Sequence, residues 1–222
     1  MSILTLNNAT YVYKNKWQST TAVKDVSYSF DCGRVYAIVG KSGSGKTTLL
    51  SMLAGLDVPT DGDVNYDGRS TRRINRDKYR RDCVSVIYQS YNLFPLLTVL
   101  ENVTYPLELQ GMKLSDARDK AKRMIDAVGL TDVVYKRYPA MLSGGEQQRI
   151  AIARALCSNA KIILADEPTG NLDTENTKNI FNMLHDLAHS RNYCVIIVTH
   201  DMAVAERADV VIHMKDGVLT ET

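Results

Sequence analysis

Short runs of apolar, β-branched residues alternate with longer segments of helical periodicity along much of the chain. The runs at residues 35–39, 84–88, 162–165 and 195–198 are each too short for a free-standing helix, and their composition predicts buried strands. Helix-like segments lie between several of these runs. That order predicts an α/β fold in which a mainly parallel sheet is flanked by helices.

Two regions depart from this pattern. The first thirty residues alternate like antiparallel strands, as at 3–9 and 22–30, and residues 62–68 predict a further strand ending in an Asp-Gly turn. Residues from about 90 to 150 are mainly helical, and one helix there is expected to begin with Ser115 as its N-cap and to stop at Gly129.

We therefore expect a single domain over residues 1–222. Its core is expected to comprise residues from about 1 to 89 and from about 160 to 222, including the antiparallel β part. A helical subdomain of about 90–159 is inserted into it.

Composition fits an ordinary globular protein, with 45% hydrophobic and 23% charged residues and a formal net charge of +2. That charge is too small to favour binding of nucleic acid, so we expect no nucleic-acid partner. No apolar run approaches the ~18–20 residues that span a bilayer, and the N-terminus lacks the features of a signal peptide. We expect the chain in the cytosol.

Cysteine and histidine offer little sign of a metal site. The four cysteines are scattered without a CxxC pair, which predicts reduced, packed thiols. His185 and His189 lie four residues apart and can share a helix face. They lack the glutamate of an HExxH motif, so a metal role is not expected for them.

A glycine-rich segment matches the phosphate-binding pattern GxxxxGK[ST] between a predicted strand and a predicted helix. Glycines let successive backbone N–H groups converge on a phosphate, and the helix N-terminus adds favourable partial charge. The lysine reaches the β- and γ-phosphates, and the threonine hydroxyl is a ligand for Mg²⁺. This loop predicts binding of a nucleoside triphosphate. The residues are Gly40, Lys41, Ser42, Gly43, Ser44, Gly45, Lys46 and Thr47, with Thr48 next on the helix.

Two acids, Asp166 and Glu167, end the predicted strand at 162–165. A parallel sheet binds ligands at the carboxyl ends of its strands, where the phosphate loop also lies. Asp166 is therefore expected to hold Mg²⁺ through a water molecule. Glu167 is the candidate general base for an attacking water.

The segment LSGGEQ opens another helix. Ser143 and Glu146 form the capping-box pattern S-x-x-E, but this does not explain Gly144 and Gly145, which each cost roughly 1 kcal/mol relative to Ala in a helix. Bare N–H groups at a helix N-terminus suit an anion instead. The candidate residues are Leu142, Ser143, Gly144, Gly145, Glu146 and Gln147.

With this segment the chain resembles the ATP-binding cassette (ABC) family over almost its whole length. Further family elements follow in order. The resemblance identifies Gln89 as the Q-loop glutamine and a third metal-site residue, Asp173 as the D-loop acid and His200 as the switch histidine that assists Glu167. It assigns adenine stacking to Tyr13, with Tyr11 as a competitor, while Asp173 also suits a helix cap.

The resemblance implies ATP and Mg²⁺ as ligands and a head-to-tail pair of identical chains. Each ATP would lie between the phosphate loop of one copy and the LSGGEQ segment of the other, with catalytic contributions from Lys46, Gln89, Glu167 and His200. One departure is Lys41, which stands where proline or serine is common and adds a charge near the phosphates.

Within the family, the chain looks most like the single-cassette subunits of lipoprotein-release, macrolide-efflux and peptide-resistance exporters, the LolD/MacB type. Transmembrane permease subunits are the implied partners, which would hold the chain at the cytoplasmic face of the cell membrane. The apolar set Tyr91, Leu93, Phe94 and Leu97 either receives the permease or packs the helical insert. A regulatory cell-division cassette of the FtsE type is the alternative, since it shares these motifs.

Overall fold

The computed structural model describes residues 2–170 and 172–221. Its N-terminal part is an antiparallel sheet in the order β2-β1-β4-β5. The predicted hairpin of the first thirty residues is present, and Asp67 and Gly68 form the turn after β4 with left-handed backbone angles. The strands are β1 (Ser2–Lys14), β2 (Ser19–Asp31), β4 (Asp61–Tyr66) and β5 (Arg69–Ser70).

The second sheet has six strands in the order β10-β9-β3-β8-β7-β6. All neighbouring pairs are parallel except β9 with β10. The four strands predicted from the apolar runs are confirmed, whereas β9 and β10 near the C-terminus were not predicted. The strands are β3 (Arg34–Val39), β6 (Val84–Ile87), β7 (Ile162–Asp166), β8 (Cys194–Thr199), β9 (Val210–Lys215) and β10 (Val218–Glu221).

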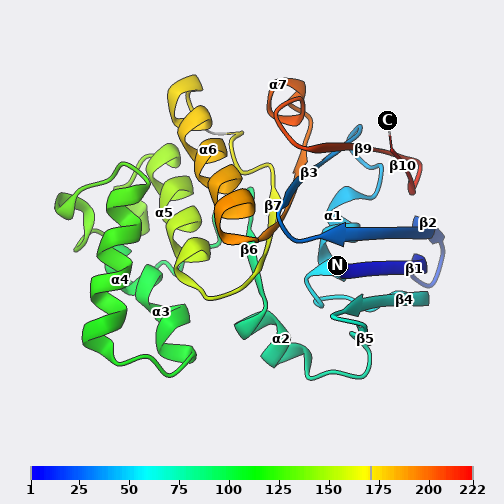
Figure 1. Ribbon diagram of the computed structural model, residues 1–222, viewed down its shortest axis with the longest axis horizontal. Coiled ribbons are helices and arrows are strands. Elements are labelled where there is room, and N and C mark those ends of the chain that lie inside the picture. Colours follow the sequence, from blue (N-terminus) through cyan, green and yellow to red (C-terminus); the bar gives the residue numbers. More distant parts are fainter. Residues whose placement is uncertain (1, 171, 222) are drawn as a thin grey trace.

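The helices fall into two groups (Figure 1). Helices α3 (Val99–Leu109), α4 (Leu114–Ala127) and α5 (Gly144–Cys157) gather at one end of the molecule, away from the antiparallel sheet. The others attach to the sheets. They are α1 (Lys46–Leu53), α2 (Arg76–Asp82), α6 (Thr174–Arg191) and α7 (Met202–Ala205).

Helix α4 starts two residues earlier than predicted. Its N-cap is Lys113, and Ser115 lies inside the first turn with its hydroxyl on Asp116 at 3.1 Å, so the prediction that Ser115 caps the helix is wrong. The predicted stop is correct. Gly129 takes a left-handed φ of 75° and its N–H donates to the carbonyl of Asp126.

Two apolar cores fix these layers. One lies between the six-stranded sheet and helices α3–α6, around residues such as Ile87, Ile150 and Leu184. The other joins the two sheets through α1, around Phe30, Leu49 and Ile196. The antiparallel sheet, the phosphate-loop helix and the parallel sheet are thereby held as one block.

Cys157 and Cys194 are buried free thiols, as expected, and burial raises the pKa of Cys157 to about 12. Across residues 2–170 and 172–221, no helix combines the length and apolar character needed to cross a bilayer.

Candidate nucleotide site

One hollow of about 550 Å³ brings together most of the predicted site residues. They come from β1, the loop before α1, the end of β6 and the ends of β7 and β8, which are distant in sequence. Parallel strands bring their carboxyl ends to one edge, so the site forms where the sequence analysis placed it. The predicted residues lining it are Tyr13, Gly40, Ser42, Gly43, Gly45, Lys46, Thr47, Thr48, Gln89, Asp166, Glu167 and His200.

Two glycines of the phosphate loop are required because other parts of the backbone approach them closely. A Cβ at Gly40 would lie 2.2 Å from the carbonyl oxygen of Met214, and one at Gly45, where φ is 106°, would lie 2.1 Å from that of Ala22. Neither position accepts a side chain. The loop is therefore a bare backbone cradle directly before α1, with Lys41 exposed on its outer side.

Lys46 is folded back onto this cradle. Its Nζ donates to the carbonyl oxygens of Gly40 at 2.8 Å and Lys41 at 3.0 Å. Nearby, the buried Ser44 hydroxyl has no hydrogen-bond partner among the described residues. An ammonium group and an orphaned hydroxyl beside bare N–H groups are donors suited to phosphate oxygens.

Thr47 and Asp166 meet across the site. The Thr47 hydroxyl donates to Asp166 Oδ2 at 3.1 Å. Burial raises the pKa of Asp166, and the hydrogen bond from Thr47 partly opposes that rise. A hydroxyl next to a half-buried carboxylate is an oxygen donor set of the kind that Mg²⁺ prefers.

Glu167 is held on both carboxylate oxygens. Oε1 lies 2.6 Å from Nδ1 of His200, and Oε2 accepts from the Thr199 hydroxyl at 3.2 Å. The backbone of Glu167 is left-handed, with φ of 48°, and its N–H donates to the carbonyl of Val198. A non-glycine residue in this conformation is strained, and here the strain turns the side chain toward His200 at the end of β8.

Tyr13 rather than Tyr11 lines the hollow. Its ring is 50% exposed and its hydroxyl lies 3.1 Å from the Thr48 hydroxyl, which ties β1 to α1. Tyr11 packs edge-on against Tyr13 with ring centroids 4.9 Å apart. An open aromatic face supported by a second ring suits stacking of a nucleobase.

The LSGGEQ segment does not line this hollow. The predicted capping box is present, since the Ser143 hydroxyl accepts from Glu146 N–H at 3.3 Å and Glu146 Oε2 accepts from Ser143 N–H at 2.8 Å. Ser143 and Gly144 are exposed, whereas Leu142 is buried. Gln147 donates to the Leu142 carbonyl. The chain therefore presents an uncovered helix start that its own phosphate loop does not use.

Asp173 caps α6, as predicted, by accepting from the N–H of Asn176 at 2.8 Å. Asn176 also accepts from Arg149 of α5 at 2.7 Å. The start of α6 is thus linked to the helix that carries the LSGGEQ segment. Asn171, between Gly170 and Asp173, lies outside the described residues.

Two features of the site were not anticipated from the sequence. Thr20, Thr21 and Ala22 of β2 also line the hollow, because the register of β2 with β1 brings them beside Tyr13. Arg154 of α5 donates to the carbonyl oxygens of Tyr91 and Asn92 at 2.9 and 2.6 Å. The signal for Arg154 was a single charge within the otherwise apolar stretch 150–157 of α5.

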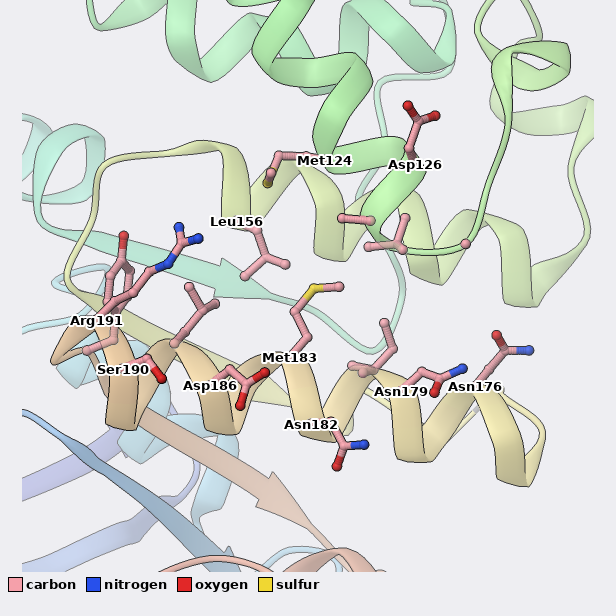
Figure 2. A pocket seen from close by; sticks show the side chains of 16 residues that line it. Met124, Asp126, Leu156, Asn176, Asn179, Asn182, Met183, Asp186, Ser190 and Arg191 are labelled. Carbon is pink, nitrogen blue, oxygen red and sulfur yellow. The ribbon is translucent and has the colours of Figure 1, made fainter.

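A separate hollow of about 730 Å³ lies between α6 and helices α4 and α5. Figure 2 shows Met124 and Leu156 facing Met183 across it, with Asn176 and Asn179 along α6. It contains none of the phosphate-loop residues or strand-end acids. It marks the seam between the helical group and α6.

The family model described as ABC transporter matches residues 23–170. The chain belongs to the ABC transporter ATP-binding family. Membership confirms the fold class and the ABC-type ATPase expected from the sequence.

Two relatives of the ABC family match over most of their length. The uncharacterized ABC transporter ATP-binding protein YclH of Bacillus subtilis (strain 168) is 42% identical over 99% of this chain and 96% of its own. The uncharacterized ABC transporter ATP-binding protein MT1014 of Mycobacterium tuberculosis (strain CDC 1551 / Oshkosh) is 38% identical over 97% of this chain and 88% of its own.

Solved ABC cassettes superpose on almost the whole chain. A dimeric post-hydrolysis state of the cassette MJ0796, bound to ADP and Pi, matches with a TM-score of 0.95 and 38% identity over 99% of this chain and 97% of that one. A second dimeric structure of MJ0796, described as a bacterial ABC transporter cassette, gives the same values.

Proposed function

We propose that this chain is the ATP-hydrolysing motor of an export or force-transmitting membrane system of the LolD/MacB type. It would work as a head-to-tail homodimer attached to a separate permease at the cytoplasmic face of the cell membrane. The observation that carries the proposal is the separation of the two halves of the site. The phosphate-loop hollow and the uncovered Ser143–Gly144 helix start are both built for phosphate, yet they lie apart in one chain.

ATP binding draws on groups whose roles follow from their positions. The adenine stacks on Tyr13, and the phosphate cradle of residues 40–47 surrounds the β-phosphate. Lys46 releases the carbonyls of Gly40 and Lys41 to contact the β- and γ-phosphates instead. The Thr48 hydroxyl contacts the Tyr13 hydroxyl and so holds the adenine-stacking ring beside the phosphate loop.

Mg²⁺ fits the donors present. Thr47 and Asp166 would hold it, Asp166 through water, and Gln89 also lines the hollow. When bound, the ion neutralises charge on the phosphate oxygens. Asp166 must be ionised for this role, and the approach of a cation lowers the pKa that burial has raised.

Hydrolysis needs a water aligned with the γ-phosphate and little covalent chemistry from the protein. Glu167 accepts a proton from that water. His200, which lies 2.6 Å from the carboxylate in this structure, turns to the γ-phosphate and leaves one carboxylate oxygen for the water. Dimer closure adds the Ser143 hydroxyl and the N–H groups of Gly144 and Gly145 from the opposing copy. Loss of the γ-phosphate removes the bridge between the copies, so the pair opens.

The permease would dock in a groove beside Gln89, with a volume of about 450 Å³. Phe94 and Tyr105 flank it with ring centroids 5.1 Å apart, and both are exposed, as is Leu109. Leu93 and Leu97 are half-buried, and Leu93 packs on the helical core, so only part of the apolar set is free. An exposed apolar groove with Arg80 and Asp77 at its rim suits an amphipathic helix.

Co-purification from the native host tests the proposal. A tagged chain should bring down a membrane protein, and the matched variant Phe94→Asp should not, while its ATPase rate without partner stays near that of the unmodified chain. Full capture by Phe94→Asp would contradict docking at this groove. ATPase stimulation of the purified complex by an exported lipid-linked or peptide cargo would then support transport, and cargo-independent turnover would favour a signalling role.

A further inference from the structure

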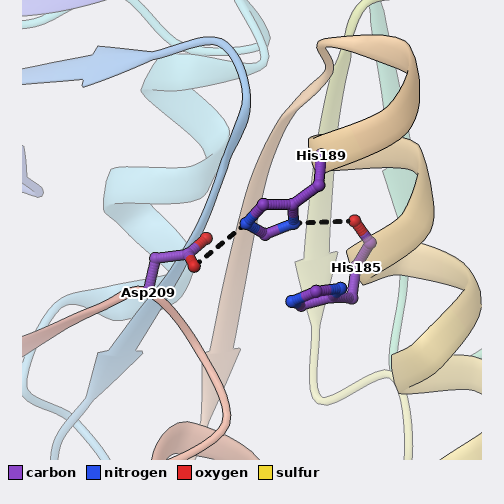
Figure 3. Close-up of side chains that lie close together, drawn as sticks. All are labelled: His185, His189 and Asp209. Carbon is purple, nitrogen blue, oxygen red and sulfur yellow. Dashed lines mark hydrogen bonds and ion pairs between the residues drawn. The ribbon is translucent and has the colours of Figure 1, made fainter.

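A cluster of two histidines and one aspartate lies away from the nucleotide site. His185 and His189 stand one turn apart on α6, and Asp209 lies just before β9 (Figure 3). One possible ligand atom from each residue lies within 4.8 Å of the others. The two rings stack with centroids 4.0 Å apart. These residues take no part in the proposed hydrolysis.

The possible ligand atoms of His189 and Asp209 already face one another. His189 Nδ1 donates to the carbonyl oxygen of His185 at 3.0 Å, which leaves Nε2 directed at Asp209 Oδ1, 3.1 Å away. Asp209 Oδ2 is occupied by the N–H of Val35 at 2.7 Å, which leaves Oδ1 for a ligand. A backbone carbonyl on the second ring nitrogen is the usual outer-shell support of a metal-bound histidine.

We propose that His185, His189 and Asp209 form a binding site for a divalent transition-metal ion of the zinc, nickel or copper class. Two imidazoles and one carboxylate are ligands that such ions accept, with water completing a tetrahedron around zinc. Ligand atoms about 2.0–2.1 Å from zinc stand about 3.4 Å apart. The pair His189–Asp209 is near that spacing, so only the half-buried His185 ring needs to turn.

The bound ion would connect three elements. It would fasten the last turns of α6 to the segment before β9, and through Asp209 and Val35 to β3. Helix α6 begins at Asp173, and β3 ends at the phosphate loop. The metal would therefore stiffen the frame between the two phosphate-binding parts of the chain.

The competing explanation is a plain ion pair between protonated His189 and Asp209, with His185 only stacked beside it. That pair needs no metal, and its exposure means that it contributes little to the stability of the fold. The two explanations differ in what they expect of His185, because the ion pair does not require it and the metal site does.

Zinc titration of the full chain, stripped with EDTA and free of nucleotide, tests the site by calorimetry. We expect His185→Gln and His189→Gln each to bind Zn²⁺ at least about tenfold more weakly, while the control His213→Gln, exposed on β9, binds like the unmodified chain. Unchanged affinity in both test variants overturns the proposal.

Imidazole NMR on the unmodified chain tests the site without any substitution, so misfolding of a variant cannot affect the result. The rings of His185 and His189 should respond to substoichiometric Zn²⁺ before those of His200 and His213. A first response at His200 would place the ion in the nucleotide site and overturn the proposal. Cobalt substitution, with the absorption of a four-coordinate ion, checks the geometry.

Discussion

His200 Nδ1 lies 2.6 Å from Oε1 of Glu167 while the other carboxylate oxygen accepts from Thr199. Both oxygens of the candidate base are thus engaged in this structure. The His200 side chain is 75% exposed and free to turn, whereas Glu167 is fixed by its left-handed backbone. This arrangement suggests that His200 moves and Glu167 stays, so a γ-phosphate that attracts His200 would free one carboxylate oxygen for water.

Glu167→Gln should keep ATP binding and reduce hydrolysis at least about 10²-fold, because the amide has nearly the shape of the carboxylate but does not accept a proton. Phosphate release and binding of a fluorescent ATP analogue measure the two effects separately. Glu206→Gln, an exposed change after α7, is the control and should hydrolyse normally. Near-normal turnover in Glu167→Gln would remove Glu167 from the role of base.

Tyr13→Ala should weaken ATP binding roughly 5- to 150-fold, the span that corresponds to about 1–3 kcal/mol for stacking of a base on an aromatic ring. Tyr13→Phe is the matched control. It keeps the ring and loses only the contact of the hydroxyl with Thr48, so its affinity should stay within a few-fold of normal. Equal loss in both variants would show that the hydroxyl matters and the ring does not.

The sequence predicted the parts of this site that depend on local pattern. The phosphate loop, the strand-end acids and the capping box of Ser143 and Glu146 each follow from a few neighbouring residues. The parallel order of the strands then places the loop and the acids at one edge. Contacts that depend on tertiary register did not follow. Thr20 and Thr21 reach the hollow only because β2 pairs with β1, and Arg154 bonds to Tyr91, 63 residues earlier in the chain, only because the fold brings α5 to it.

The error at Ser115 has a similar cause. Capping propensity favours serine over lysine, yet the helix begins at Leu114, two residues earlier than an N-cap at Ser115 requires. Ser115 therefore falls inside the first turn, and its hydroxyl bonds to its neighbour Asp116. The strands β9 and β10 were missed because their short segments carry charges and a turn that hide the apolar alternation.

Asp166→Asn should raise the melting temperature of the nucleotide-free chain at neutral pH. Burial raises the pKa of Asp166, so the folded state holds the proton more tightly than the unfolded chain, and ionisation costs stability as the pH rises above the unfolded value of about 3.9. The stabilisation should therefore be full at pH 7 and vanish near pH 4. Thermal unfolding in EDTA across this range measures it.

Asp173→Asn is the matched control with the opposite sign. Hydrogen bonds from Asn176 lower the pKa of Asp173, so its ionised form stabilises the fold above the unfolded pKa and this contribution is lost as the pH falls through the lowered value. The variant should melt slightly lower at neutral pH, with the difference closing in acid. Stabilisation by both variants would point to general charge repulsion instead.

Arg154→Met should lower the free energy of unfolding by about 1.5–3 kcal/mol, the scale of hydrogen bonds to a charged group. Arg154 donates to two consecutive carbonyls, those of Tyr91 and Asn92, whose left-handed φ angles of 63° and 46° need such support. Urea unfolding measures the loss. Arg123→Met, exposed on α4, should change little, and an equal loss there would exclude a specific role for the two bonds.

Gly144→Ala tests the start of α5 in two ways. Alanine normally gains up to about 1 kcal/mol over glycine in a helix, but here the new Cβ would lie 2.9 Å from the Tyr91 hydroxyl. The gain in stability should therefore be absent in the single variant and return in Gly144→Ala with Tyr91→Phe. In both, the added methyl stands on the exposed surface that must meet the ATP of the opposing copy, so ATP-dependent dimerisation, followed by light scattering in a Glu167→Gln background, should be lost. A Gly144→Ala chain that still dimerises with ATP as tightly as its parent would show that this helix start is not the surface that closes over the nucleotide.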